Sequence, residues 1–398
     1  MQTDAMTNTP LRHLALLATA LALVVIVFGA FVRLSNAGLS CPDWPTCYGR
    51  LTWPSSDHEI AHANASFERA VETQKAWREQ LHRHLAAVLG LLVFAMALVA
   101  ARKRAGAWLR ISAAAALVAL SILLYIKHYY VAAIVLASLG ELILLWSAMR
   151  WRKQDHAGLA SVILMVIVFQ ALLGMWTVTW LLKPIVVMSH LLGGLTTLAL
   201  LAWLGLRLSG FAADAHGFST VTGWTSVASA RGNAVPPRRA LVIVALGLLA
   251  VQIALGGWTS ANYAAWACGT DFPKCLDQWW PLANYREGFV LWRGIGVDYE
   301  GGVLDGPART GIQMAHRLFA LLLSGHLLML SIKLLRHAPL RGYAIALLLA
   351  LVTQLMLGIA NVKLGLPLYI AAAHNAVAAL LLLLLLALLA RLTPRVAR

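Results

Sequence analysis

The chain has 398 residues, of which 60% are hydrophobic and only 12% are charged, and its mean hydropathy is +0.75. A water-soluble domain of this size cannot bury that much apolar surface, so the composition excludes a soluble globular protein. The net charge of +16 does not indicate a nucleic-acid partner, because the basic residues gather in short loops between apolar runs. This distribution follows the positive-inside rule of membrane proteins.

Apolar runs long enough to cross a hydrocarbon core of about 30 Å recur along the whole chain. We predict an all-α polytopic membrane protein with ten spans, at 11–33, 82–101, 107–126, 130–150, 158–178, 186–208, 239–260, 311–334, 340–361 and 369–391. The first run is too long for the apolar region of a signal peptide and lacks a good cleavage site. It is therefore expected to be the first membrane anchor.

Two long loops interrupt the spans, at 34–81 and 261–310, and each carries six acidic and four basic residues. Both loops are predicted to lie outside the cytoplasm, and an even number of spans then places both termini in the cytoplasm. The N-terminus does not resemble an Arg- and Ser-rich transit segment, which favours a bacterial inner membrane.

Each outer loop holds one cysteine pair, in "SCPDWPTCYG" and in "CGTDFPKC". In an oxidising compartment these pairs predict two short-range disulfides, Cys41–Cys47 and Cys268–Cys275. Two roles remain open at this point: a brace that caps a helix bundle, or a thiol pair that cycles. A zinc site is disfavoured, because no histidine stands at finger-like spacing beside either pair.

The loops reveal an internal repeat. "GAFVRLSNAGLSCPDWPTC" matches "GGWTSANYAAWACGTDFPKC", and "FQALLGMWTV" matches "TQLMLGIANV". The offset between matching residues falls from 234 at His82 and His316 to 184 at His190 and His374, so the first half holds about 50 more residues. These extra residues contain two predicted spans, an extra helix pair at about 107–150.

Without the extra pair each half is a four-helix unit, which predicts two pseudo-symmetric four-helix bundles. The expected division is an N-terminal repeat over 1–210, an inner linker over 211–238 and a C-terminal repeat over 239–398.

Four of the thirteen histidines occupy equivalent positions in the repeat: His82 and His190 in the first half, His316 and His374 in the second. All four are predicted at the outer ends of helices. Paired imidazoles from two helices of a four-helix bundle can hold haem iron, one on each face. We predict haem ligation, against the alternative of purely structural histidines.

Charged residues near these histidines differ between the halves. Glu79 stands three residues before His82, whereas Gln313 stands three residues before His316. Side chains at this spacing share a helix face. Glu79 is therefore a candidate to move protons or stabilise positive charge, unless it is an ordinary acidic residue in the first turn of a helix. Three arginines are candidates for binding haem propionates: Arg33, Arg83 and Arg317.

Together these motifs resemble the heme A synthase family over nearly the whole chain. The resemblance rests on the first cysteine motif, on Glu79 to Arg83 as "ExxHR", on "LLGMWTV" ahead of "SHLLGG" at His190, on "NYAAWACGTDFPKC", and on "ARTGIQMAHR" up to His316. The extra helix pair departs from the eight-helix plan of that family.

The resemblance implies oxidation of heme O to heme A, from porphyrin methyl to formyl by successive hydroxylation, in haem A biosynthesis for terminal oxidases. His82 and His190 would bind the substrate heme O, and His316 and His374 a permanent haem b. Glu79 matches the catalytic acid of the family. The partners considered are heme O, heme O synthase, an electron acceptor, membrane lipid and further copies of the chain.

Two rival interpretations belong to other classes. A di-haem b-type membrane cytochrome, which transfers electrons only, fits the paired histidines equally well but not the lone Glu79 or the cysteine loops. A quinone-linked disulfide oxidoreductase fits the cysteine pairs but leaves the four repeated histidines unexplained.

Overall fold

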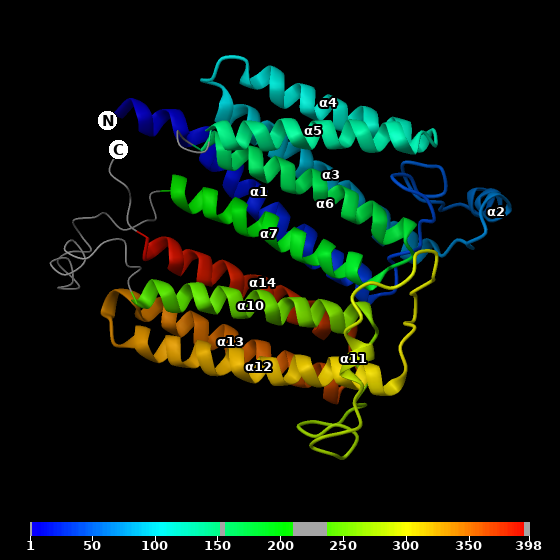
Figure 1. The fold of residues 1–398 in the computed structure, drawn as a ribbon, viewed down its shortest axis with the longest axis vertical. Coiled ribbons are helices and arrows are strands. Elements are labelled where there is room, and N and C mark those ends of the chain that lie inside the picture. The colour runs from blue at the N-terminus through cyan, green and yellow to red at the C-terminus, as the bar shows by residue number, and fades with distance from the viewer. Residues whose placement is uncertain (1, 152–155, 210–236, 394–398) are drawn as a thin grey trace. The chain divides into compact units, whose positions relative to one another are not determined.

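The computed structural model describes residues 2–151, 156–209 and 237–393 (Figure 1). Within these ranges it is all helical, and ten helices are long and apolar enough to cross a membrane. The predicted class, an all-α multi-pass membrane protein, is confirmed. The chain divides into two compact units, one of residues up to Leu204 with Val290–Val303, the other of Gly205–Phe289 with the remaining C-terminal residues. The predicted inner linker, 211–238, lies almost entirely outside the described residues, so the predicted domain boundaries stay a prediction.

The first unit contains six long helices and one short one. They are α1 (Gln2–Leu34), α2 (Asp57–Ser66), α3 (Thr73–Ala101), α4 (Ala107–Ile126), α5 (Tyr130–Trp151), α6 (Ala157–Thr179) and α7 (Pro184–Leu208), whose last turn extends into the second unit. Helix α3 packs against α1 and α6. Gln170 of α6 hydrogen-bonds His190 of α7, and Ile26 of α1 lies beside Gly194 of α7. Helices α1, α3, α6 and α7 thus form a closed group of four.

The second unit contains α10 (Pro237–Ala261), α11 (Tyr285–Gly288), α12 (Gly306–Leu335), the 3-10 helix η1 (Ala338–Leu340), α13 (Arg341–Lys363) and α14 (Leu368–Arg391). Four of these helices contact one another in a ring, because α10 packs on α12 and α14, and α13 packs on α12 and α14. Buried leucines such as Leu327, Leu347 and Leu385 fill the space between them. Each unit therefore presents one group of four long helices.

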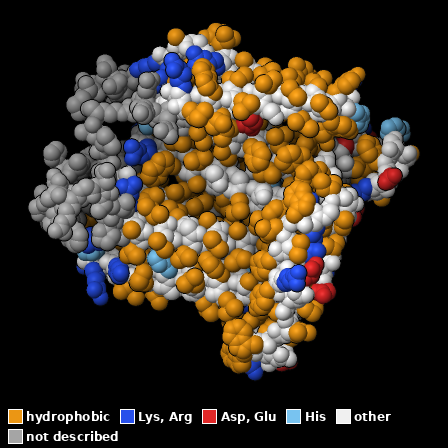
Figure 2. Space-filling view, viewed as in Figure 1, with side chains coloured by type: hydrophobic (Ala, Val, Ile, Leu, Met, Phe, Trp, Pro, Cys, Tyr) orange, Lys and Arg blue, Asp and Glu red, His pale blue; other side chains and the backbone are white. Residues whose placement is uncertain are grey.

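The extra helices α4 and α5 form a hairpin that packs along α3 and α6 of the first unit. Small residues let the two helices approach closely: a Cβ atom at Gly140 of α5 would lie 3.0 Å from the Ala114 carbonyl oxygen of α4. Close backbone approach at small residues is the usual basis of helix packing in lipid. The outer faces of these helices are covered by hydrophobic side chains, and Lys and Arg gather at one end (Figure 2).

Helices α3 and α12 begin earlier than the hydropathy pattern predicts. The predicted spans start at residues 82 and 311, whereas α3 starts at Thr73 and α12 at Gly306. The start of α3 packs against the first cysteine loop and the start of α12 packs against α11, so both are less apolar than a lipid-facing segment and a hydropathy window misses them. At α12 the Asp305 side chain caps the helix by accepting from Ala308 N at 2.8 Å. Because α3 and α12 begin early, Glu79 and Gln313 both lie within helices rather than in the loops that precede them.

Candidate functional site

The four repeated histidines lie on four different helices, as two pairs. His82 of α3 and His190 of α7 belong to the first unit, and His316 of α12 and His374 of α14 belong to the second. In each unit the two imidazoles are close enough to interact electrostatically. The structure therefore brings together the two repeated histidines within each half.

A glycine of a neighbouring helix lies against the edge of each imidazole; we call these four positions glycine notches. A Cβ atom at each notch would come within 2.7 to 3.2 Å of the histidine Cε1 atom, at Gly29 for His82, Gly174 for His190, Gly256 for His316 and Gly358 for His374. Such distances are shorter than ordinary van der Waals contact. The glycine notches also occupy equivalent positions in the two halves. The repeat therefore includes the surroundings of each histidine as well as the histidine itself.

Three of the histidines also contact a glutamine from a neighbouring helix. The amide nitrogen Nε2 of Gln170 lies 3.0 Å from His190 Nδ1, that of Gln252 lies 3.1 Å from His316 Nδ1, and that of Gln354 lies 3.2 Å from His374 Nε2. Gln170 Nε2 also donates to the His190 carbonyl oxygen at 2.5 Å. These amides hold the imidazole rings in one orientation.

This arrangement fits haem better than a bare metal ion. Within the described ranges no three His, Cys, Asp or Glu side chains cluster as an ion site requires. Two imidazoles on separate helices could instead hold haem iron between them. Buried ring nitrogens of His82 and His374 have no hydrogen-bond partner among the described residues. A buried polar atom without a partner is costly, so these imidazoles are suited to binding a further group, and haem iron would supply one.

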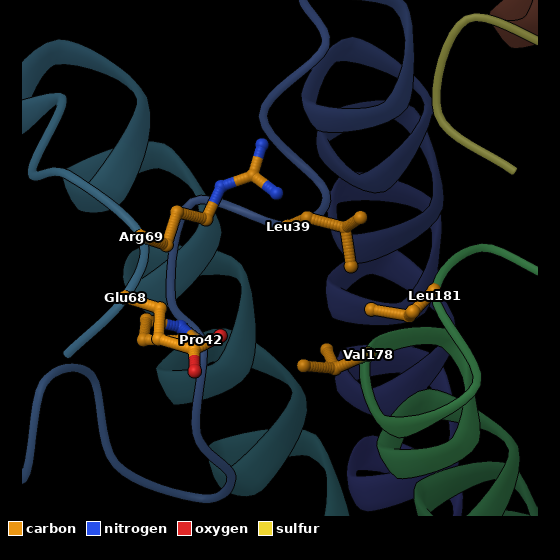
Figure 3. A pocket seen from close by; sticks show the side chains of 6 residues that line it. All are labelled: Leu39, Pro42, Glu68, Arg69, Val178 and Leu181. Carbon is orange, nitrogen blue, oxygen red and sulfur yellow. The ribbon is translucent and has the colours of Figure 1, made fainter. Parts of the chain in front are cut away.

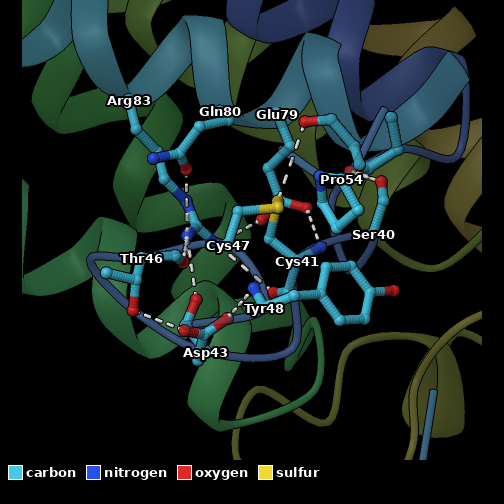
Figure 4. Close-up of a disulfide and its surroundings, with 12 residues drawn as sticks. Ser40, Cys41, Asp43, Thr46, Cys47, Tyr48, Pro54, Glu79, Gln80 and Arg83 are labelled. Carbon is cyan, nitrogen blue, oxygen red and sulfur yellow. Dashed lines mark hydrogen bonds and ion pairs between the residues drawn. A yellow bond between two sulfur atoms is a disulfide. The ribbon is translucent and has the colours of Figure 1, made fainter. Parts of the chain in front are cut away.

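Glu79 lies buried beside the first disulfide, with its carboxylate held from two sides (Figure 4). Its Oε2 atom accepts from the backbone N–H of Cys41 at 2.8 Å, and its Oε1 atom accepts from Arg83 Nη2 at 2.6 Å. Both side chains of this ion pair are largely buried, at 6% and 12% exposed. A buried carboxylate with such partners is fixed in place. One helical turn separates Glu79 from His82, so the two side chains share a face of α3.

Arg83 joins α3 to the first cysteine loop, residues 40–50. Its Nη1 atom donates to the carbonyl oxygens of Asp43 at 2.8 Å and Thr46 at 2.6 Å, in addition to the bond from Nη2 to Glu79 (Figure 4). Asp43 in turn accepts from the backbone N–H of Tyr48 at 2.6 Å and from the Thr46 hydroxyl. The guanidinium group thus fastens the loop over Glu79.

The second unit repeats this fastening without the carboxylate. Arg317 donates to the carbonyl oxygens of Lys274 and Asp271, both at 3.0 Å. Gln313 takes the place of Glu79, and its buried Oε1 atom has no hydrogen-bond partner in the part of the chain that the structure describes. Glu79 and Gln313 therefore occupy equivalent buried positions, one with a carboxylate and the other with a neutral amide.

Both cysteine pairs form disulfides, as predicted. The Cα atoms are 4.6 Å apart in Cys41–Cys47 and 4.7 Å apart in Cys268–Cys275, and all four residues are buried. Cys47 pairs with Arg50 in a short antiparallel bridge, and Cys275 pairs with Gln278 in the same way. Since Cys41 also donates to Glu79, the first disulfide braces a loop that positions the candidate catalytic carboxylate.

A segment of the second outer loop, Val290–Val303, belongs to the first unit; we call it the strap. The strap contacts the turn between α6 and α7: Tyr299 N donates to the Leu181 carbonyl oxygen at 3.1 Å. Glu300 of the strap forms an ion pair with Arg69 at 2.6 Å. Arg69 also lines a pocket of about 270 Å³ between the first cysteine loop and the end of α6 (Figure 3).

Sequence reasoning missed Lys183, a fully buried residue beneath the strap. Its ammonium group lies 3.4 Å from the ring centre of Trp292 in the strap and 5.3 Å from that of Trp180. Burial lowers the pKa of Lys183, and the aromatic faces offset part of that penalty. Gln252 was also missed, although a glutamine four residues before a glycine notch is visible in three helices of the sequence.

Comparisons with known proteins agree on one family. The family model for cytochrome oxidase assembly protein, COX15-CtaA, matches residues 12–127 and 122–386. The chain is 38% identical to a heme A synthase of Shewanella oneidensis over 90% of each chain. It is 27% identical to a heme A synthase of Rhizorhabdus wittichii, over 94% of this chain and 91% of the relative.

Proposed function

The chain belongs to the COX15-CtaA cytochrome oxidase assembly family, and from this premise we propose that it oxidises heme O to heme A. The proposal places the substrate at His82 and His190 and a permanent haem b at His316 and His374. The methyl group that reacts becomes a formyl group by successive hydroxylation. The product serves terminal oxidases, in keeping with the cytochrome oxidase assembly role of the family.

One observation supports the assignment of the sites. The two histidine pairs are equivalent, but the side chain one helical turn before His82 differs from the one before His316. Glu79 is a buried carboxylate held by Cys41 and Arg83, whereas Gln313 is a neutral amide. Oxidation of a methyl group releases protons and develops positive charge at the carbon. A fixed carboxylate can accept a proton or stabilise that charge, and an amide cannot accept a proton at neutral pH.

Each residue of the first site has a separate role in the proposed reaction. His82 and His190 bind and orient the substrate from two faces. Glu79 holds or takes a proton beside the reacting group. Arg83 fixes Glu79 and holds the cysteine loop over the site, which excludes water from the buried carboxylate. A haem b at the second site would supply a one-electron redox centre, and Arg33, Arg83 and Arg317 remain our candidates near haem propionates.

The location of the protein and its partners follow from the same proposal. We place the protein in a bacterial inner membrane with both termini in the cytoplasm, because ten spans with basic short loops and acidic long loops follow the positive-inside rule in that orientation. Heme O synthase is the proposed source of the substrate, and a separate electron acceptor completes the oxidation.

The test is haem extraction and mass analysis of protein purified from cells that supply heme O. The wild type is expected to yield heme A, and Glu79→Gln to lower the amount of heme A by about 100-fold or more, because general acid–base groups contribute at least that factor. Heme O or its hydroxylated intermediate accumulates in its place. The matched control is Gln313→Leu, which changes the equivalent residue of the other half and leaves heme A formation intact.

The rival function, a di-haem cytochrome that only transfers electrons, is supported by the close equivalence of the two histidine pairs. It predicts that haem b alone is extracted from the wild type and from the Glu79→Gln variant. Unchanged heme A in Glu79→Gln would instead remove Glu79 from the mechanism and retain the family activity.

A further inference from the structure

A short sequence pattern distinguishes one of the four haem-site helices from the other three. A glutamine precedes the glycine notch by four residues in three helices: "QALLG" from Gln170, "QIALG" from Gln252 and "QLMLG" from Gln354. The equivalent stretch of α1 is "VIVFG", so Val25 stands where the pattern has glutamine. Residues at this spacing lie on one helix face, so the residue before each notch faces the same histidine as the notch.

Each of these glutamines reaches the imidazole that its notch contacts. The amide-to-ring distances are 3.0 to 3.2 Å, and all three amide oxygens are buried without a hydrogen-bond partner among the described residues. An imidazole that binds iron through one nitrogen carries an N–H on the other. A half-turn of the amide presents its oxygen to that N–H, in exchange for the hydrogen bond that the Gln170 and Gln252 amides donate to the histidine carbonyl oxygen. Each glutamine can therefore satisfy a ligating histidine.

Space for one of these amides is built into the neighbouring helix. A Cβ atom at Gly193 of α7 would lie only 2.2 Å from the Gln170 side-chain oxygen, and one at Gly194 would lie 3.4 Å from its nitrogen. Any side chain at Gly193 would displace the glutamine from His190.

His82 has no such partner. Val25 is buried at the equivalent position and offers no polar group. The ring of His82 contacts Phe28 at a centroid distance of 6.4 Å and the Gly29 notch, and its buried Nδ1 has no hydrogen bond within the described ranges. Among the described residues, His82 is thus the one repeated histidine whose ring contacts no glutamine.

Hydrogen bonds to the second nitrogen of a ligating histidine fix the ring and raise its basicity, and their loss typically weakens metal binding by about 10- to 100-fold. We propose that Gln170, Gln252 and Gln354 are positioning residues for haem-ligating histidines. Because Val25 offers no hydrogen bond at the equivalent position, His82 is the ligand that dissociates from haem iron most readily. The first site then exchanges its haem and the second retains it. This inference rests on the proposed function and deepens it, because an enzyme must release a haem product while keeping a haem cofactor.

The experiment follows haem transfer from the purified holoprotein to excess apomyoglobin by absorbance, and identifies the transferred haem by mass. The wild type is expected to lose O- or A-type haem in a fast phase and haem b in a slow one. Val25→Gln slows the fast phase by about 10-fold or more, and Gln252→Val accelerates the slow phase by a similar factor. Val25→Leu, which changes packing without adding a polar group, leaves the fast phase unchanged.

A spectroscopic measurement separates positioning from simple packing. Gln252→Val is expected to shift the low-spin haem signal in electron paramagnetic resonance, and Gln252→Glu, which keeps an acceptor oxygen, to restore both the signal and the slow release. Equal release rates from the two sites, or a fast phase that Val25→Gln does not slow, would overturn the inference. A wild type that contains haem b alone would instead contradict the proposed function.

Discussion

Arg83 is the residue on which the first site depends most, because one guanidinium group links a catalytic candidate to a loop. It pairs with Glu79 and holds the carbonyl oxygens of Asp43 and Thr46. Removing one partner of a buried ion pair leaves an uncompensated charge, which typically costs about 3–5 kcal/mol. Arg317 holds equivalent carbonyls but has no carboxylate beside it on α12, where Gln313 stands.

We predict that Arg83→Met lowers the stability of the protein in detergent much more than Arg317→Met does. Both variants lose their hydrogen bonds to loop carbonyls, three at Arg83 and two at Arg317, and only Arg83→Met also leaves a buried carboxylate without its ion pair. Thermal unfolding of the two purified variants measures the difference. Equal losses of stability would show that the Glu79 ion pair contributes nothing beyond loop attachment.

Residues of the site differ in how far the sequence alone identified them. The histidines and the cysteine pairs could be named as candidates because the repeat marks their positions independently of the fold, and Glu79 because Gln313 takes its place in the other half. The partners of Arg83 could not be identified, because the carbonyl groups within its reach depend on how residues 40–50 turn. Lys183 has no equivalent in the repeat, since Pro367 occupies the matching position, and its burial depends on a strap from about 110 residues further along the chain.

At the scale of elements, the strap is the feature that the sequence did not predict at all. Residues 290–303 read as part of a long acidic loop of the C-terminal half, yet they pack with the N-terminal unit. Tyr299 is buried against the turn after α6, and its hydroxyl donates to the Gly294 carbonyl oxygen at 2.7 Å. Such long-range contacts leave no periodic signal in the chain, whereas the membrane helices do.

We expect Glu300→Gln to loosen the strap locally, because the ion pair with Arg69 is its charged attachment. An ion pair that is about one-third exposed contributes roughly 0.2–1 kcal/mol, so global unfolding should barely change. Hydrogen exchange of Val290–Val303 should rise several-fold. Glu72→Gln, which removes the exposed pair with Lys75, is the matched control and should leave the strap protected. Unchanged exchange in Glu300→Gln would show that apolar packing alone holds the strap.

At the scale of the whole molecule, the chain is one four-helix design used twice and then specialised. The glycine notches show the shared part, and Glu79, the strap and the α4–α5 hairpin belong to the first unit only. The hairpin approaches the first cysteine loop, where Tyr125 at its turn contacts Trp44 edge-on at 6.4 Å. The extra helix pair therefore lies beside the site to which we assign the chemistry.

The same substitution in both halves tests this design. A methyl group at Gly29 would lie 2.7 Å from His82, and one at Gly256 would lie 3.2 Å from His316. We predict that Gly29→Ala displaces His82 and removes most of the first-site haem, whereas Gly256→Ala is largely tolerated. The ratio of O- and A-type haem to haem b in each purified variant gives the answer. Equal retention of both haem types in Gly29→Ala would contradict the role of Gly29 in making room for His82.

The central claim is that the two histidine pairs hold different haems, one a substrate and one a cofactor. The most direct test is mass analysis of the haems extracted from wild-type protein and from a His316→Ala, His374→Ala double variant, both made in cells that supply heme O. The account predicts haem b together with O- or A-type haem in the wild type, and selective loss of haem b in the variant. Haem b as the sole species in the wild type, or loss of O- and A-type haem with haem b retained in the variant, would contradict it.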